Sequence, residues 1–114
     1  MKSKILSLLG FAAKAGKLSF GFEASIWSLK TRKAALVAVS DEISPKSRKE
    51  MQYYADKFNV KITVLDIDMK TVSDAVGKKC GILSVNDSGF ADAILKAVSQ
   101  NAAEDIKGGN ADDQ

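Results

Sequence analysis

The sequence contains no histidine and a single cysteine, Cys80. Without histidine the chain lacks the commonest general base and the commonest zinc ligand, so a structural zinc site is not expected. One cysteine excludes an intrachain disulfide and favours a reducing compartment. No apolar run approaches the roughly 18 residues that a membrane span needs. These absences predict a soluble cytoplasmic protein without metal, cofactor or membrane partner.

Motifs of nucleotide-binding and hydrolytic enzymes are missing as well: there is no Walker loop, no G-x-G-x-x-G and no G-x-S-x-G. Asp41 and Glu42 are adjacent carboxylates in a turn, a poor arrangement for paired acid–base chemistry. Asp66 and Asp68 suggest magnesium only weakly and are more typical of solvated loop residues. Cys80 has neighbouring lysines but no histidine to activate it, so a buried structural thiol is expected. The chain is predicted not to be an enzyme.

Positive and negative charges are distributed unevenly along the chain. Residues 1–100 carry 16 Lys and Arg against 10 Asp and Glu, whereas residues 101–114 carry one lysine against four acidic residues. A basic body fits a domain that binds a polyanion, although mildly basic soluble proteins are common. The last segment has little apolar surface to bury. We therefore expect one monomeric domain over residues 1–100 and a disordered acidic tail over residues 101–114.

Apolar periodicity and turn residues predict helices that alternate with strands. A continuous apolar run over residues 34–39 indicates a strand covered on both faces. The alternation predicts an α/β fold with helices packed on both sides of a mostly parallel or mixed sheet. The helices are expected over residues 3–15, 21–29, 45–58, 71–77 and 90–99, and the strands over residues 17–20, 34–39, 60–65 and 81–85.

Basic residues lie near the ends of the predicted strands and helices. In such sheets ligands usually meet the loops beyond the carboxyl ends of strands, where helix N-termini offer free N–H groups to phosphates. Lys46 follows Pro45 in the first turn of a helix, where its charge opposes the helix dipole unless an anionic partner offsets it. For any single lysine a solvated surface is the alternative. The lysines expected to approach phosphates from one end of the sheet are Lys17, Lys46, Lys78 and Lys79.

Two aromatic side chains near Gly21 are candidates for stacking on RNA bases, Phe22 and Trp27. The helical spacing of Trp27 favours a place in the core. Phe22 lies at the edge of an element, and both roles remain open for it. Gly21 itself is predicted to be a turn glycine with a positive φ, with close approach of RNA as the alternative. Tyr53 and Tyr54 are adjacent, so one of them is expected to be exposed.

Short motifs follow one another in a defined order: Leu9-Gly10-Phe11-Ala12, Ala15-Gly16-Lys17, Gly21 before a helix, Leu36 to Asp41, Val60 entering a strand, Ala75-Val76-Gly77-Lys78, and Asp87 followed by Gly89-Phe90-Ala91. As an ordered set over residues 3 to about 98 they resemble the ribosomal L7Ae family, whose relatives include the L30e proteins. The last motif is most similar to the small bacterial branch. The resemblance implies a three-layer α-β-α sandwich around a mixed four-stranded sheet.

The resemblance also implies recognition of structured RNA, such as a kink-turn or ribosomal RNA, on the ribosome or in translation. The RNA surface of the family combines the glycine-led start of the second helix, the loop after the second strand and the loop before the last strand. The corresponding residues here are Gly21-Phe22-Glu23, Ser40-Asp41 and Ala75-Val76-Gly77-Lys78-Lys79.

The start of the second helix departs from the pattern of kink-turn binders, which is Gly-x-Asn-Glu with a lysine three residues later. Glu23, Ala24 and Trp27 occupy the Asn, Glu and Lys positions. Asparagine both donates and accepts hydrogen bonds, whereas the Glu23 carboxylate only accepts them, so either a different RNA target or a low affinity is expected, with general RNA binding retained. Two other functions remain open. One is a protein–protein adaptor of the same fold, and the other is the substrate-recognition domain of an RNA-modifying enzyme.

Overall fold

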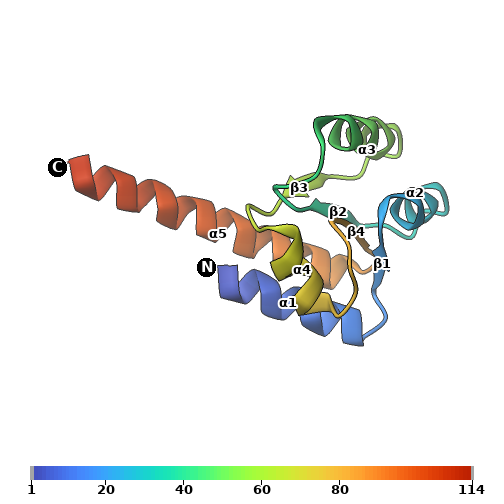
Figure 1. Cartoon of the computed structure of the whole chain (residues 1–114), viewed down its shortest axis with the longest axis horizontal. Helices are drawn as coiled ribbons and strands as arrows, with labels where there is room; N and C mark the ends of the chain where they lie inside the picture. Colours follow the sequence, from blue (N-terminus) through green and yellow to red (C-terminus); the bar gives the residue numbers. More distant parts are fainter. Residues whose placement is uncertain (1, 114) are drawn as a thin grey trace.

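The computed structural model describes the backbone of residues 2–113 and the side chains of residues 2–101. Helices and strands alternate along this part of the chain, as the sequence predicts (Figure 1). The predicted acidic tail falls almost entirely outside the described side chains and stays a prediction. The elements are α1 (Lys2–Lys14), β1 (Leu18–Phe20), α2 (Phe22–Lys30), β2 (Leu36–Val39), α3 (Pro45–Lys57), β3 (Ile62–Val64), α4 (Met69–Val76), β4 (Ile82–Val85) and α5 (Ser88–Asp113).

The four strands form one mixed sheet in the order β1-β4-β2-β3. β4 is antiparallel to both β1 and β2, whereas β2 and β3 are parallel. The register places Leu36 of β2 opposite Val85 of β4, and Val37 opposite Ile62 of β3. This order brings the ends of β1, β2 and β3 and the start of β4 to the same end of the sheet. We call this line of strand ends the Gly21 edge, after the residue that follows β1.

Helices cover both faces of the sheet, so the predicted α-β-α sandwich is confirmed (Figure 1). Side chains of a strand alternate between the two faces. In β2, Leu36 and Ala38 pack with α1, α4 and α5, whereas Val37 and Val39 pack with α2 and α3. All four are fully buried, which accounts for the continuous apolar run in the sequence. Burial of each valine or leucine contributes about 1.5–3 kcal/mol.

The helix α2 packs on the sheet through small polar residues. Ser25 and Ser28 are 0% and 2% exposed. The hydroxyls of Ser28 and Ser19 of β1 share a hydrogen bond of 2.7 Å, and the Asn86 side-chain amide donates to the Ser19 hydroxyl at 2.9 Å. With this serine face toward the sheet, Trp27 points outward and is 65% exposed. The prediction that Trp27 belongs to the core is wrong.

The ends of α4 set the positions of two loops. The Thr71 amide donates to the Asp68 carboxylate at 2.7 Å, so Asp68 is the N-cap and the helix begins at Met69. The predicted start of this helix at residue 71 is therefore two residues too late. At the other end the Gly77 amide donates to the Ser73 carbonyl, and Gly77 adopts a φ of 77°. This left-handed conformation favours glycine and ends α4 where the sequence predicts.

Candidate nucleic-acid interface

The segments that the resemblance assigned to RNA meet at the Gly21 edge. The Gly21 amide donates to the Ile82 carbonyl at 2.8 Å, and the Ser40 amide donates to the Gly81 carbonyl at 2.8 Å. Both acceptors lie at the start of β4. The start of α2, the loop after β2 and the loop before β4 are thereby held next to one another by backbone hydrogen bonds.

Gly21 is the N-cap of α2 with a φ of 94°. The prediction of a turn glycine with positive φ is confirmed, since residues with a side chain rarely adopt this conformation. A Cβ at this position would meet no atom within 4 Å, so the backbone rather than space requires the glycine. No side chain caps the helix. The N–H groups of its first turn are therefore available to an anion at this edge.

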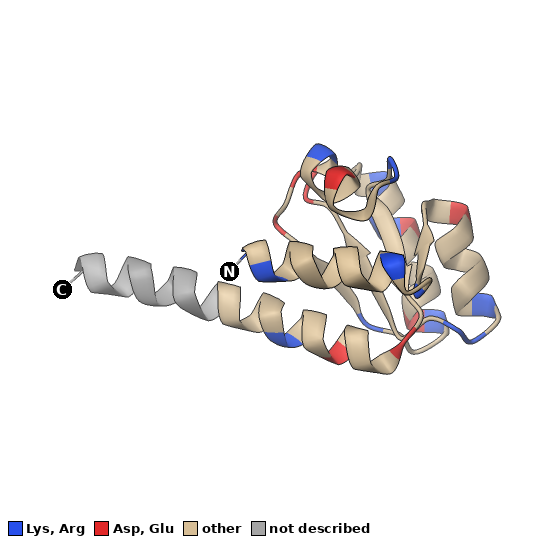
Figure 2. Cartoon of the chain, turned by 90° about the horizontal axis from the view of Figure 1, so that it is seen from below, with Lys and Arg blue, Asp and Glu red and all other residues tan. Residues whose placement is uncertain are grey.

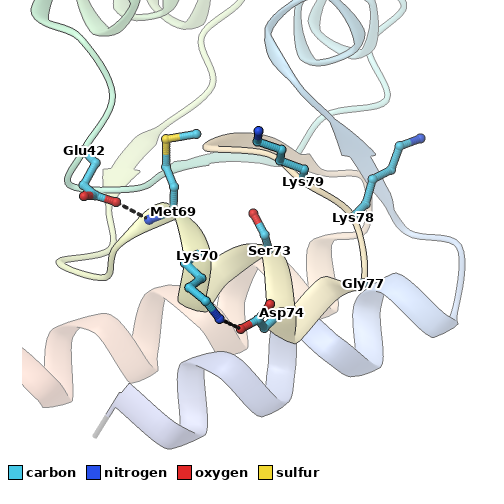
Figure 3. A pocket seen from close by; sticks show the side chains of 8 residues that line it. All are labelled: Glu42, Met69, Lys70, Ser73, Asp74, Gly77, Lys78 and Lys79. Atoms are coloured by element: carbon cyan, nitrogen blue, oxygen red, sulfur yellow. Dashed lines mark hydrogen bonds and ion pairs between the residues drawn. The ribbon is translucent and has the colours of Figure 1, made fainter.

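A groove of about 790 Å³ runs along α4 beside this edge (Figure 3). Glu42 and Met69 lie at one end of the groove, Ser73 lies in the middle, and Lys78 and Lys79 lie toward the other end. The Met69 amide donates to the Glu42 carboxylate at 2.7 Å, which ties the loop after β2 to the first turn of α4. The groove thus connects two of the three predicted segments.

Two lysines supply the positive charge of this groove. Lys70 is neutralised by Asp74 at 2.9 Å, and the hydrogen bond that the Lys70 ammonium donates to this carboxylate raises the pKa of Lys70. Lys78 and Lys79 are exposed, and within the described residues neither forms a salt bridge. The Lys78 ammonium lies 5.4 Å from the centroid of the Phe20 ring, a weak attraction at an exposed site. Both ammonium groups can therefore meet phosphate without losing an ionic partner.

Ser73 holds the loop that carries these lysines against α4. Its hydroxyl accepts a hydrogen bond from the Cys80 amide at 3.0 Å and donates to the Cys80 carbonyl at 3.1 Å. Cys80 is 6% exposed, and burial raises the pKa of its thiol despite the opposing charge of Lys78. A raised pKa disfavours the reactive thiolate, and the predicted burial of Cys80 is confirmed.

Comparison with known proteins identifies the family. Residues 3–95 match the sequence profile of the Ribosomal protein L7Ae/L30e/S12e/Gadd45 family. The chain belongs to this family. It is 30% identical over 93 residues to the large ribosomal subunit protein eL30 of Candida glabrata, covering 80% of this chain and 88% of that protein. It is 28% identical over 90 residues to the RNA-binding protein YlxQ of Enterococcus faecium, covering 79% and 86%.

A solved structure of a protein with unknown function from Bacillus halodurans has the same fold, with a TM-score of 0.80 and 25% identity. The match covers 84% of this chain and 97% of that chain. The family resemblance drawn from the ordered motifs is thus confirmed for the folded domain.

In this L7Ae-family chain a second hollow adjoins the groove on the side of α2. Glu42 and Met69 also line this hollow of about 250 Å³, which reaches Gly21 and Phe22. The start of α2 and the loop that carries Lys78 and Lys79 (the lysine loop) therefore border two adjoining hollows, which together we call the depression. Sequence reasoning missed Met69 and treated Glu42 only as a turn carboxylate. The signal that could have found Met69 is the N-cap Asp68, which places the next residue in the first turn of a helix.

Some of the predicted residues lie elsewhere. The Lys17 carbonyl accepts a hydrogen bond from the Asn86 amide at 2.7 Å, where β4 has ended, so Lys17 lies at the opposite end of the sheet. The expectation that it joins the other lysines is wrong. Val76 is 9% exposed in the core, and a Cβ on Gly10 of α1 would lie 3.2 Å from the Ala75 carbonyl oxygen. Ala75 and Val76 thus belong to α4, and the exposed loop starts only after them.

The other predicted residues have different roles at the edge. Ser40 is 1% exposed, and its hydroxyl accepts a hydrogen bond from the Glu42 amide at 3.0 Å, so it shapes the loop. Asp41 is exposed beside it. Lys46 is exposed in the first turn of α3, next to the N-cap Ser44. Asp41 and Lys46 are thus exposed near the Gly21 edge, but neither lines the two hollows of the depression.

Charged residues of both signs are spread over the described part of the chain and do not form one basic face (Figure 2). Lys78 and Lys79 are therefore a local concentration of positive charge beside the groove and not part of one basic face. Among residues 2–101, no group of three His, Cys, Asp or Glu side chains could hold a metal ion. In the same part of the chain no helix combines the length and apolarity needed to cross a membrane.

Proposed function

We propose that this chain is a non-catalytic RNA-binding protein that recognises structured RNA, acting as a cytoplasmic monomer in association with the ribosome or translation. One observation carries the proposal: the uncapped start of α2 and the lysine loop border two adjoining hollows at the Gly21 edge, which share Glu42 and Met69 as lining residues. Membership of the L7Ae/L30e family supports it, since the relatives include a ribosomal protein and a protein named as RNA-binding.

Each part of the depression suits a different part of an RNA strand. Lys78 and Lys79 offer six N–H donors (three for each ammonium group) to phosphate oxygens, and the free N–H groups of the first turn of α2 offer more. Such contacts fix the position of the RNA without reading its sequence. Met69 and Phe22 supply the apolar surface between them. Bases or riboses that are not enclosed in a regular duplex can pack there.

The RNA target that we propose is ribosomal RNA with an irregular, kinked element. Glu23 is exposed at the start of α2 and offers acceptors only, while Ala24 cannot form a polar side-chain contact. The preference for a kink-turn over other irregular RNA should therefore be weaker than in relatives with the Gly-x-Asn-Glu pattern.

The test is RNA binding by the purified full chain, measured by fluorescence anisotropy at 50 mM and 200 mM salt. The probes are a kink-turn hairpin, the same hairpin with the bulge removed to leave a continuous duplex, and ribosomal RNA. Binding to the hairpin and to ribosomal RNA, stronger than to the duplex and weaker at high salt, supports the proposal. If none of the three RNAs binds at 50 mM salt, the proposal fails and a protein–protein adaptor becomes the better hypothesis.

A further inference from the structure

The depression at the Gly21 edge has an aromatic extension between α2 and α3. A third hollow, of about 330 Å³, is lined by Phe22, Trp27, Lys30 and Tyr54, among others. Phe22 also lines the hollow at Gly21, so the two hollows adjoin at this side chain. Trp27 is 65% exposed within it. Because Trp27 shares this hollow with Phe22 and Tyr54, the three aromatic side chains form a grouped apolar surface of the kind that marks interaction sites.

The charged side chains around this hollow indicate which kind of ligand could bind over Trp27. Lys30 lies at one side, with its ammonium 5.8 Å from the centroid of the Tyr54 ring. Glu23 is exposed at the other side. A carboxylate repels phosphate but accepts hydrogen bonds from amino groups, whereas an ammonium attracts phosphate. A nucleotide therefore fits with its phosphate at Lys30 and its base toward Glu23.

We propose that this hollow binds one unpaired base of the RNA held at the Gly21 edge, stacked on Trp27 with its amino group toward Glu23. The proposal rests on the proposed function and adds a site to it. Every base has a flat face that can stack on an indole ring. Guanine, adenine and cytosine carry an exocyclic amino group from which Glu23 can accept a hydrogen bond. Uracil offers only its ring N3–H, which is flanked by two carbonyl oxygens that repel a carboxylate. The site should therefore discriminate against uridine.

Trp27 is the only tryptophan in the chain, so its fluorescence reports on this site alone. The probes are hairpins with one common stem and a three-nucleotide bulge of either cytidine or uridine, together with the fully paired stem. Binding is followed both by the anisotropy of a dye on the RNA and by Trp27 emission. We expect the cytidine bulge to quench Trp27 and to bind more tightly than the uridine bulge, and the paired stem to leave the emission unchanged.

Variants separate stacking from general binding. Trp27→Ala should weaken binding of the cytidine bulge by about tenfold or more, and Trp27→Phe should restore most of it, because an aromatic face remains. Phe11→Ala is the matched control: Phe11 is also an exposed aromatic residue, 60% exposed, but it lies on α1 at the other face of the sheet. It should bind like the parent chain. Glu23→Ala should remove the preference for cytidine over uridine.

The two readouts distinguish failure of this site from failure of RNA binding. If the dye shows binding while Trp27 emission stays constant and Trp27→Ala binds like the parent, the base site is refuted and the RNA-binding function stands. If the uridine bulge binds as tightly as the cytidine bulge, the role of Glu23 is refuted. If no hairpin binds at low salt, both proposals fall, and an exposed Trp27 then points to a protein partner.

Discussion

Replacing Lys78 and Lys79 together with alanine tests whether the groove along α4 contacts the RNA backbone. Both side chains are exposed and form no salt bridge among the described residues, so their loss should change binding more than folding. The structural contact at risk is the weak attraction between Lys78 and the Phe20 ring, worth about 0.5–1 kcal/mol at an exposed site. The melting temperature should therefore fall by no more than about 5 °C.

The effect on binding follows from the release of counterions. Each phosphate contact contributes about 0.9 to the slope of log K against log salt on a duplex, and about 0.7 on a single strand. Loss of both lysines should flatten the slope by about 1.4 to 1.8 units. Between 50 mM and 200 mM salt this corresponds to about a tenfold difference, so the variant should lose about ten times more affinity at the lower salt concentration.

The matched control is the double variant Lys57→Ala and Lys61→Ala. It removes the same charge, and Lys57 also lies near an aromatic ring, 5.8 Å from the centroid of Phe58. Both control lysines lie where α3 ends and before β3 begins, away from the Gly21 edge. The slope of the control should stay near that of the parent chain. The reasoning is refuted if the Lys78 and Lys79 variant keeps the parent slope, or if the control flattens it equally.

Four further outcomes are expected. Hydrogen bonds from the Thr71 hydroxyl and amide lower the pKa of Asp68 below its ordinary value of 3.8. The contribution of Asp68 to stability should therefore be complete above that value and be lost as the pH falls through the lower pKa of the folded state. Asp68→Asn should reduce this acid dependence in urea unfolding. Ser73→Ala should cost about 1–2 kcal/mol in the same assay and loosen the lysine loop, seen as faster amide exchange at Cys80. Glu23→Asn with Ala24→Glu should increase the preference for a kink-turn hairpin over its duplex; an unchanged ratio would contradict the role of this helix start. Deletion of residues 108–114 should leave the melting temperature unchanged, and a fall of more than about 5 °C, of order 1 kcal/mol, would contradict the predicted tail.

The fold could be predicted from the sequence because its determinants are local. The apolar run that ends at Val39 indicates a strand covered on both faces, and Gly77 indicates the end of a helix. The relative directions of the strands could not be predicted from the sequence. Regular alternation of helices and strands fits a mainly parallel sheet as well as a mixed one, and only the pairing of β4 between β1 and β2 decides between them.

The site was predicted less completely because its composition depends on which strand ends meet. Lys17 and Gly21 are close in the sequence, but β1 runs between them and carries them to opposite ends of the sheet. Met69 and Glu42 are 27 residues apart and meet only because the loop after β2 reaches the first turn of α4. Neither relation has a signature that a single sequence shows. The lysines of this loop could be identified from the sequence, but the depression that they border could not.

The misplacement of Trp27 has a more specific physical cause. Apolar periodicity assigned Trp27 to the core, but α2 turns Ser25, Ser28 and Leu29 toward the sheet and buries them. The hydroxyl of Ser28 shares a hydrogen bond with Ser19, whereas the buried hydroxyl of Ser25 has no hydrogen-bond partner among the described residues. Because an α-helix has 3.6 residues per turn, Trp27 lies about half a turn away from these three residues and faces away from the sheet. The packing of α2 that made the predicted core position of Trp27 wrong therefore places this side chain at the surface, one turn of helix from the segment where RNA is proposed to bind.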